Sequence, residues 1–147
     1  MRALGIDLGS KRIGIALSDS AGTMATPYEV VARSGDRARD HRRIAALAEE
    51  AAAECLVVGL PLSMDGSHGP AATDAVAEAD ELATVTGLPV EMWDERLTTV
   101  TADRDLMALD MKAPARRRVV DKVAASVMLQ AWLDHRRLAA ARKDTRR

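Results

Sequence analysis

The sequence is poor in aromatic residues and in cysteine. Its 147 residues include no Phe, one Tyr, two Trp and one Cys. A hydrophobic core must therefore be built from Ala, Val, Leu, Ile and Met. The single cysteine, Cys55, excludes an internal disulfide, and together with scattered histidines it cannot form a zinc site. Because Cys55 begins an apolar run, we expect a buried hydrophobic side chain rather than a reactive thiol.

Long apolar runs are also missing. No stretch is long enough to cross a bilayer, and Asp7 interrupts the apolar N-terminus before it could serve as a secretory signal. These absences predict a cytoplasmic protein without a membrane partner. The length suits one domain with a full core and is too short for two comfortable lobes.

Basic residues are absent from one long segment. No Lys or Arg occurs between positions 44 and 95, whereas eleven basic residues face three acidic ones from Lys112 to the C-terminus. The basic segment includes Arg116, Arg117 and Arg118 and suits a phosphate-rich partner, although charged runs are more often solvated helix faces.

The apolar pattern predicts strands that alternate with helices. Two β-prone runs within residues 3–19 form a hairpin, and residues 24–31 add a third antiparallel strand. The apolar runs 55–60 and 90–93 are typical of parallel strands that follow helices. Helices are expected over 36–51, 72–87, 98–109 and 120–131, with a mobile loop over 110–118 and a basic, disordered tail over 140–147.

The order of these elements predicts an α/β fold of the ribonuclease H-like type. Its five-stranded mixed sheet would be antiparallel over the first three strands and parallel over the last two, with helices on both faces. We expect a single domain over residues 1–139.

Asp7 is the unusual residue of the first strand. Its neighbours are core residues, so a carboxylate here is costly unless a cation or hydrogen-bond donors meet it. Gly5, Gly9 and Gly14 weaken the two strands of the hairpin, which indicates that another part of the molecule or a ligand approaches their backbone.

Three acidic sites fall where the predicted sheet would bring them together. They are Asp7, the pair Asp94 and Glu95 after the fifth strand, and Asp121 in the first turn of the last helix. Converging carboxylates repel one another unless cations bind between them, and Mg²⁺ or Mn²⁺ prefers such oxygen ligands. One or two of these ions could activate water and hold the leaving oxygen in phosphodiester hydrolysis.

Each of these residues also has an ordinary structural role available. Asp121 could stabilise the dipole of its helix, and Asp94 could pair with Arg96 or cap a helix. Lys11 and Arg12 at the turn of the hairpin could simply be solubilising, or they could bind phosphates beside the scissile one.

Four blocks of the sequence resemble the signature of the YqgF/RuvX family. They are 7–19, 57–67, 93–99 and 120–126, and the resemblance extends to about residue 133. It implies a ribonuclease H-like nuclease that matures the 5′ end of precursor 16S ribosomal RNA, in a family also described as Holliday junction resolvases. By position, the acidic set falls on Asp7, on Asp94 or Glu95, and on Asp121. The choice between Asp94 and Glu95 stays open, and Glu95 is favoured for its longer reach.

The sequence therefore predicts a Mg²⁺- or Mn²⁺-dependent nuclease that acts on precursor ribosomal RNA, as a monomer or homodimer. One alternative is a DNA endonuclease that resolves branched junctions as a symmetric dimer, and another is a non-catalytic RNA-binding factor in ribosome assembly. An actin-like ATP-binding protein is disfavoured because it needs two lobes. The candidate nucleic-acid-binding residues are Lys11, Arg12, Arg96, Arg116, Arg117 and Arg118.

Overall fold

The computed structural model describes the chain over residues 1–98 and 114–145, and its side chains over 1–98 and 120–144. The strands are β1 (Ala3–Leu8), β2 (Arg12–Ser18), β3 (Ala25–Ala32), β4 (Cys55–Leu60) and β5 (Val90–Asp94). The helical segments are α1 (Arg37–Glu50), α2 (Pro70–Thr86), the short 3₁₀ helix η1 (Glu95–Leu97) and α4 (Pro114–Thr145).

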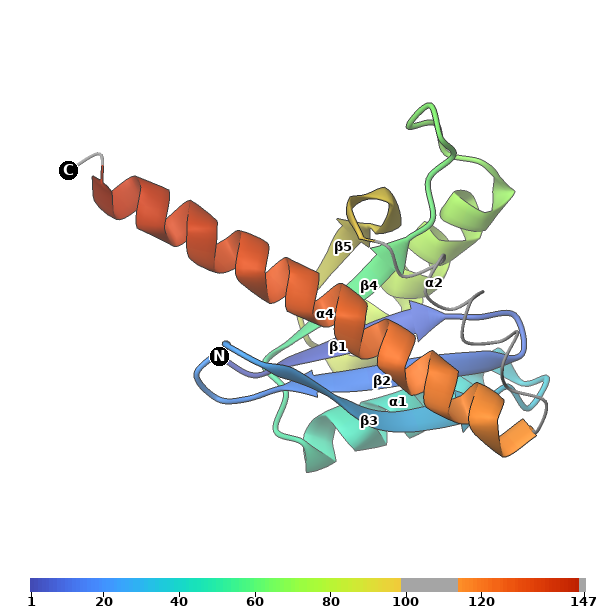
Figure 1. Ribbon diagram of the computed structural model, residues 1–147. Coiled ribbons are helices and arrows are strands. Elements are labelled where there is room, and N and C mark those ends of the chain that lie inside the picture. The colour runs from blue at the N-terminus through green and yellow to red at the C-terminus, as the bar shows by residue number, and fades with distance from the viewer. Residues whose placement is uncertain (99–113, 146–147) are drawn as a thin grey trace.

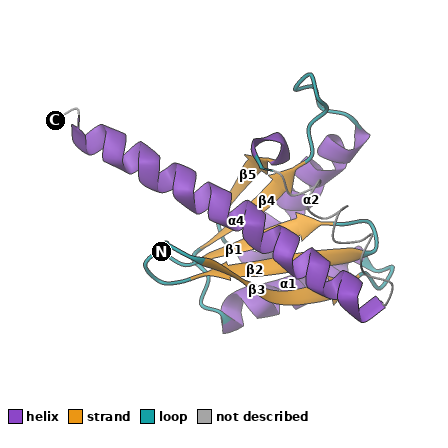
Figure 2. Cartoon of the chain, in the orientation of Figure 1, coloured by secondary structure: helices purple, strands orange, loops and turns teal. Residues whose placement is uncertain are grey.

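The strands form one five-stranded sheet in the order β3-β2-β1-β4-β5. β1 pairs with β2, and β2 with β3, in antiparallel fashion, whereas β4 lies parallel to both β1 and β5. The helices α1 and α2 cover one face of the sheet, and α4 crosses the other face diagonally (Figures 1 and 2). The predicted mixed sheet with helices on both faces is therefore confirmed.

Successive side chains of each strand point to opposite faces of the sheet, and each face carries its own hydrophobic core. Leu4, Ile6 and Val58 belong to the cluster that packs under α1 and α2, while Ala3 and Val57 belong to the cluster under α4. Every other residue of a strand therefore faces α4, and this face carries the smaller side chains. The core on both faces is built from aliphatic residues, with Trp93 and Trp132 added on the α4 side.

Two glycines of the N-terminal hairpin let α4 lie directly on the sheet. A Cβ at position 5 would be 2.9 Å from Cβ of Leu129, and one at position 14 would collide with the backbone oxygen of Asp121. The expectation that something approaches the backbone at these glycines is thus confirmed at Gly5 and Gly14, and α4 is what approaches.

Local signals in the sequence explain where α1 and α2 begin and end. The Asp36 side chain accepts a hydrogen bond from the backbone N–H of Arg39 at 3.1 Å and caps α1. Pro70 occupies the first turn of α2, and Gly87 ends that helix in the left-handed conformation that glycine adopts easily.

The last helix is longer than the sequence predicts at both ends. Residues 114–118, expected in a mobile loop, form its first turns, because Pro114 is tolerated at a helix start. Residues 140–145, expected as a disordered tail, continue it as helix. Alanine, arginine and lysine favour helix, and extending an existing helix needs no new nucleus. This end of α4 projects beyond the sheet (Figure 1).

Two further expectations concern residues outside the described part. The helix expected over 98–109 lies there except for Thr98, which ends η1, as do residues 110–113 of the expected loop. Within the described residues, none of the helices combines the length and apolarity needed to span a bilayer.

Candidate active site

The carboxyl ends of the parallel strands define a cleft at one edge of the sheet. β1, β4 and β5 are neighbours there, and Leu60 at the end of β4 pairs with Asp94 at the end of β5. Asp7 from β1 and Glu95 from η1 both line this cleft, which has a volume of about 570 Å³. Loops and ends of this kind are where open α/β sheets place their ligands.

Gly59 on β4 provides the space that the Glu95 carboxylate occupies. It lies on the strand between β1 and β5, and a Cβ at this position would collide with Oε1 of Glu95. The missing side chain lets the Glu95 carboxylate reach inward over β4, toward the strand that carries Asp7. Asp7 itself is 4% exposed, so its carboxylate is held within the protein rather than in bulk solvent.

The structure separates the roles of Asp94 and Glu95. Asp94 accepts hydrogen bonds from the Arg96 backbone N–H at 3.0 Å and from its Nη2 at 2.7 Å. The side-chain bond from Arg96 is the main reason that the pKa of Asp94 lies below its usual value. Of the two acids, Glu95 lines the cleft with Asp7, and Asp94 caps η1.

The pKa of Glu95 is shifted in the opposite direction to that of Asp94. Burial raises the pKa of the Glu95 carboxyl above its ordinary value, and the nearby negative charge of Asp94 raises it further. A carboxylate in this situation gains stability from a cation. Groups with shifted pKa values in clefts are candidate functional residues.

Asp121 does not line this cleft, and its carboxylate is bound to Arg12. Its Oδ2 accepts a hydrogen bond from Arg12 Nε at 2.7 Å, and 14% of its side chain is exposed. The backbone of Asp121 sits over Gly14, which pairs with Asp7 across the hairpin. Asp121 is therefore near the strand of Asp7, yet in the part of the chain that the structure describes no three acidic, histidine or cysteine side chains form a ready metal site.

The candidate nucleic-acid-binding residues have different surroundings. Lys11 is exposed at the turn of the hairpin, whereas Arg12 and Arg96 are engaged by Asp121 and Asp94. The arginines 116–118 belong to the first turns of α4, but their side chains lie outside the described residues.

Two residues of the cleft, Arg33 and Glu78, and the buried His41 behind them were missed by sequence reasoning. Arg33, just past β3, donates two hydrogen bonds to the Glu78 carboxylate, at 3.0 and 2.9 Å. His41 of α1 lies 2.7 Å from the same carboxylate through Nε2. The signal was present, because Glu78 and His41 interrupt the apolar faces of α2 and α1, where a charged or polar residue needs a partner.

Comparisons with known proteins agree with this architecture. A family model described as "RuvX: Holliday junction resolvase" matches residues 1–135. A protein of Mycobacterium sp. (strain KMS), named "Putative pre-16S rRNA nuclease", is 48% identical over 141 residues, which cover 95% of this chain and 83% of that protein. One of Myxococcus xanthus (strain DK1622) with the same name is 47% identical over 137 residues, or 93% of this chain and 90% of its own.

A solved structure shares the fold. The RuvC of T. thermophilus, in complex with a Holliday junction substrate, superposes with a TM-score of 0.59 at 19% identity. The match covers 92% of this chain and 95% of that chain. The ribonuclease H-like fold expected from the order of strands and helices is therefore confirmed.

Proposed function

The chain belongs to the RuvX family, and from this membership we propose that it is a metal-dependent nuclease that hydrolyses phosphodiester bonds in precursor 16S ribosomal RNA. The observation that carries the proposal is the placement of Asp7 and Glu95 in one cleft at the carboxyl ends of the parallel strands. The names of the relatives supply the substrate, and synthesis of ribosomal RNA in bacteria supplies the location, the cytoplasm.

The residues of the cleft suit a hard divalent cation. Asp7 and Glu95 offer carboxylate oxygens, the ligands that Mg²⁺ and Mn²⁺ prefer, and the missing side chain of Gly59 lets the Glu95 carboxylate lie over β4 in the same cleft as Asp7. The raised pKa of Glu95 supports the same assignment, since a cation would favour its charged form. Bound there, Mg²⁺ or Mn²⁺ would supply Lewis acidity and an activated water.

The ion pair between Asp121 and Arg12 is the part of the site that changes, in our proposal, when the substrate binds. In our proposal, an incoming phosphate competes with Asp121 for the Arg12 guanidinium, which can bind either anion through its fork of N–H donors. Released from Arg12, the Asp121 carboxylate becomes available as the third acidic ligand beside Asp7 and Glu95. The ion pair therefore keeps both groups in place until the nucleic acid binds.

A second candidate function is a junction-resolving DNA endonuclease. The description of the family model favours it, because that description names a Holliday junction resolvase. Such an enzyme would use the same carboxylates, but it must cut two strands symmetrically and would therefore act as a dimer.

One set of cleavage assays separates these functions. Purified protein and its Asp7→Asn variant are incubated with precursor 16S RNA, plain single strands and four-way DNA junctions, with Mg²⁺ or Mn²⁺ and with EDTA. We expect metal-dependent cleavage of the precursor RNA that Asp7→Asn abolishes. Paired cuts in junction DNA with intact RNA would favour the second function, and no cleavage under any condition would favour a non-catalytic RNA-binding factor.

A further inference from the structure

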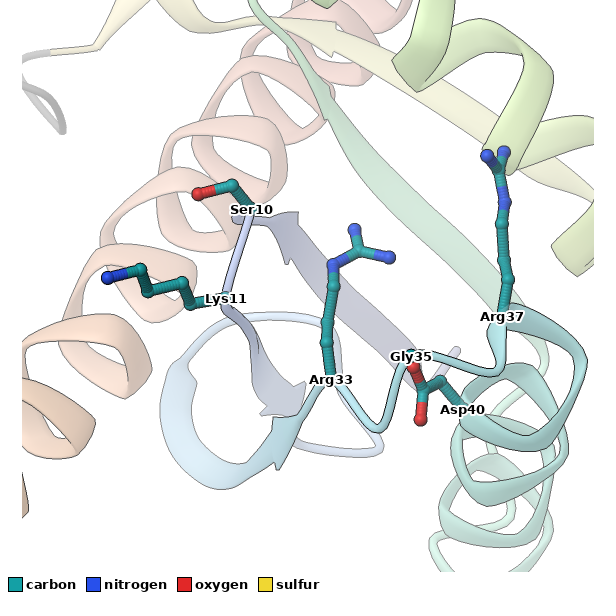
Figure 3. A pocket seen from close by; sticks show the side chains of 6 residues that line it. All are labelled: Ser10, Lys11, Arg33, Gly35, Arg37 and Asp40. Atoms are coloured by element: carbon teal, nitrogen blue, oxygen red, sulfur yellow. The ribbon is translucent and has the colours of Figure 1, made fainter.

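A second cavity opens beside the cleft of Asp7 and Glu95. It has a volume of about 430 Å³ and shares Ser10, Arg33 and Arg37 with that cleft. Its other lining residues are Lys11, Gly35 and Asp40 (Figure 3). The acidic cleft and this cavity thus lie side by side, and the Ser10 hydroxyl and the guanidinium groups of Arg33 and Arg37 border both.

The charges that solvent can reach in this cavity are mainly positive. Lys11 is exposed, and the Arg37 side chain is 44% exposed. Asp40, by contrast, is 4% exposed and accepts hydrogen bonds from the backbone N–H and the hydroxyl of Ser34. A ligand that enters therefore meets the cations and the Ser10 hydroxyl before it meets a carboxylate.

Arg37 is placed to exchange its present partner for a ligand. Its Nε lies 2.6 Å from Oε2 of Glu81, and both side chains are about half exposed, at 44% and 50%. The buried Glu78 carboxylate is more distant, at 3.9 Å from the same nitrogen. Exposed ion pairs of this kind are weak, so a phosphodiester can compete with Glu81 for the guanidinium. In Figure 3 the Arg37 side chain extends from the start of α1 toward α2, and Lys11 extends toward α4.

Arg33 has a different role, because all three nitrogens of its guanidinium donate hydrogen bonds within the protein. It binds Glu78 with both terminal nitrogens and donates from Nε to the Gly9 carbonyl oxygen at 2.7 Å. Its backbone N–H also donates to the Lys11 carbonyl oxygen at 2.9 Å. Arg33 thereby fixes the turn that carries Ser10 and Lys11 relative to α2.

We propose that Ser10, Lys11 and Arg37 bind neighbouring phosphates of the RNA strand next to the bond that is cut, with Lys11 on the side of α4 and Arg37 on the side of α2. Arg33 and Glu78 hold the turn that carries Ser10 and Lys11 in position. This inference rests on the proposed nuclease function and adds to it the path of the substrate. The strand runs from the acidic cleft over Ser10 to the N-terminal end of α1. Arg33 is a positioning residue, and Lys11 and Arg37 contact the substrate.

The test measures RNA binding without catalysis. A fluorescein-labelled single-stranded RNA is titrated with protein in EDTA at several salt concentrations, and fluorescence anisotropy gives the Kd. Arg37→Ala and Lys11→Ala should each raise the Kd about fivefold. Each should also lower the slope of log Kd against log salt by about 0.7, the loss of one phosphate contact to a single strand.

Arg42→Ala is the matched control. Arg42 is exposed on α1 and does not line either cavity, so its removal changes the net charge equally but should leave the Kd and the slope close to wild type. Glu81→Gln should strengthen binding, and this gain should be smaller when Arg37 is already alanine.

The inference is overturned if Arg37→Ala and Lys11→Ala affect binding no more than Arg42→Ala does, or if the wild-type protein does not bind the RNA at all. Because the assay contains no metal, a protein that binds as expected yet cuts nothing in the cleavage assay would contradict the nuclease function and leave the phosphate contacts standing.

Discussion

At Glu95, two effects oppose the negative charge that a metal ligand must carry. Burial and the neighbouring Asp94 both raise the pKa of this carboxyl above the ordinary 4.5. A group whose pKa is raised by folding stabilises the folded state below its unfolded pKa, and this stabilisation is lost as the pH rises through the folded pKa. Glu95 thus lowers the stability of the metal-free protein at neutral pH relative to a neutral residue.

The Glu95→Gln variant should therefore be more stable than the wild-type protein in EDTA at pH 7. The difference in melting temperature should shrink as the pH falls from 7 through the raised pKa of Glu95 toward 4.5, because the wild-type carboxyl becomes protonated in the folded protein over this range. Thermal denaturation followed by circular dichroism across this pH range checks the sign. A variant that is less stable than wild type at pH 7 would show that the Glu95 charge is already well compensated by the protein.

A buried ionic network connects α1 and α2 to the turn between β1 and β2, because Arg33 binds both Glu78 and the Gly9 carbonyl oxygen. Glu78 of α2 binds Arg33 after β3 and His41 of α1, so one carboxylate connects three parts of the fold. Burial acts to raise the pKa of Glu78, but the hydrogen bonds from Arg33 and His41 outweigh it, and the pKa lies below its usual value. The stability that this carboxylate provides is present at neutral pH and is lost as the pH falls through its lowered pKa.

Removal of the Glu78 side chain should leave the largely buried Arg33 guanidinium without its carboxylate partner. We expect Glu78→Ala to lower the free energy of unfolding by about 3 kcal/mol at pH 7, measured by urea denaturation, because an uncompensated buried charge remains. Glu81→Ala is the comparison, since its pair with Arg37 is half exposed and its contact with His41 is longer, at 3.7 Å; together these should contribute less than about 1 kcal/mol. Equal effects of the two variants would contradict the importance of the buried network.

The contact between α4 and the sheet depends on glycine at position 14. A methyl group there would collide with the backbone oxygen of Asp121, and backbone cannot move aside as a flexible side chain can. Gly14→Ala should lower the free energy of unfolding by about 2 kcal/mol and should reduce cleavage, because it displaces Asp121. Gly69→Ala, which meets only a serine hydroxyl at 3.2 Å, should do neither. Unchanged stability in Gly14→Ala would mean that α4 is not seated as closely as described.

For the whole molecule, the strand order and the two-faced sheet could be predicted from the sequence because apolar alternation and turn residues are local signals. Asp7 could be identified as a candidate site residue because a charge in a core strand is locally anomalous. The pairing of Asp121 with Arg12 could not be predicted, since it depends on how α4 crosses the hairpin. The choice of Glu95 over Asp94 likewise depends on which side chain passes over Gly59, a fact of packing rather than of pattern.

The end of α4 is expected to be dispensable for folding. Residues 135–144 are exposed, and the last buried side chains of the helix are Trp132 and Leu133. A chain shortened to residues 1–139 should therefore melt within about 3 °C of the full chain. A chain shortened to residues 1–131 loses both buried side chains and should be strongly destabilised. A large loss of stability in the first truncation would show that the projecting helix packs against something in solution.

Binding of Mn²⁺, followed by the loss of its free electron paramagnetic resonance signal, tests whether Glu95 rather than Asp94 is a ligand of the proposed metal site. Wild-type protein, Glu95→Gln and Asp94→Asn are titrated under the same conditions, and the last two differ from wild type by the same loss of one negative charge. We predict that Glu95→Gln weakens Mn²⁺ binding at least about tenfold, while Asp94→Asn binds nearly as the wild-type protein does. Metal binding that survives Glu95→Gln but is lost in Asp94→Asn would contradict the site described here.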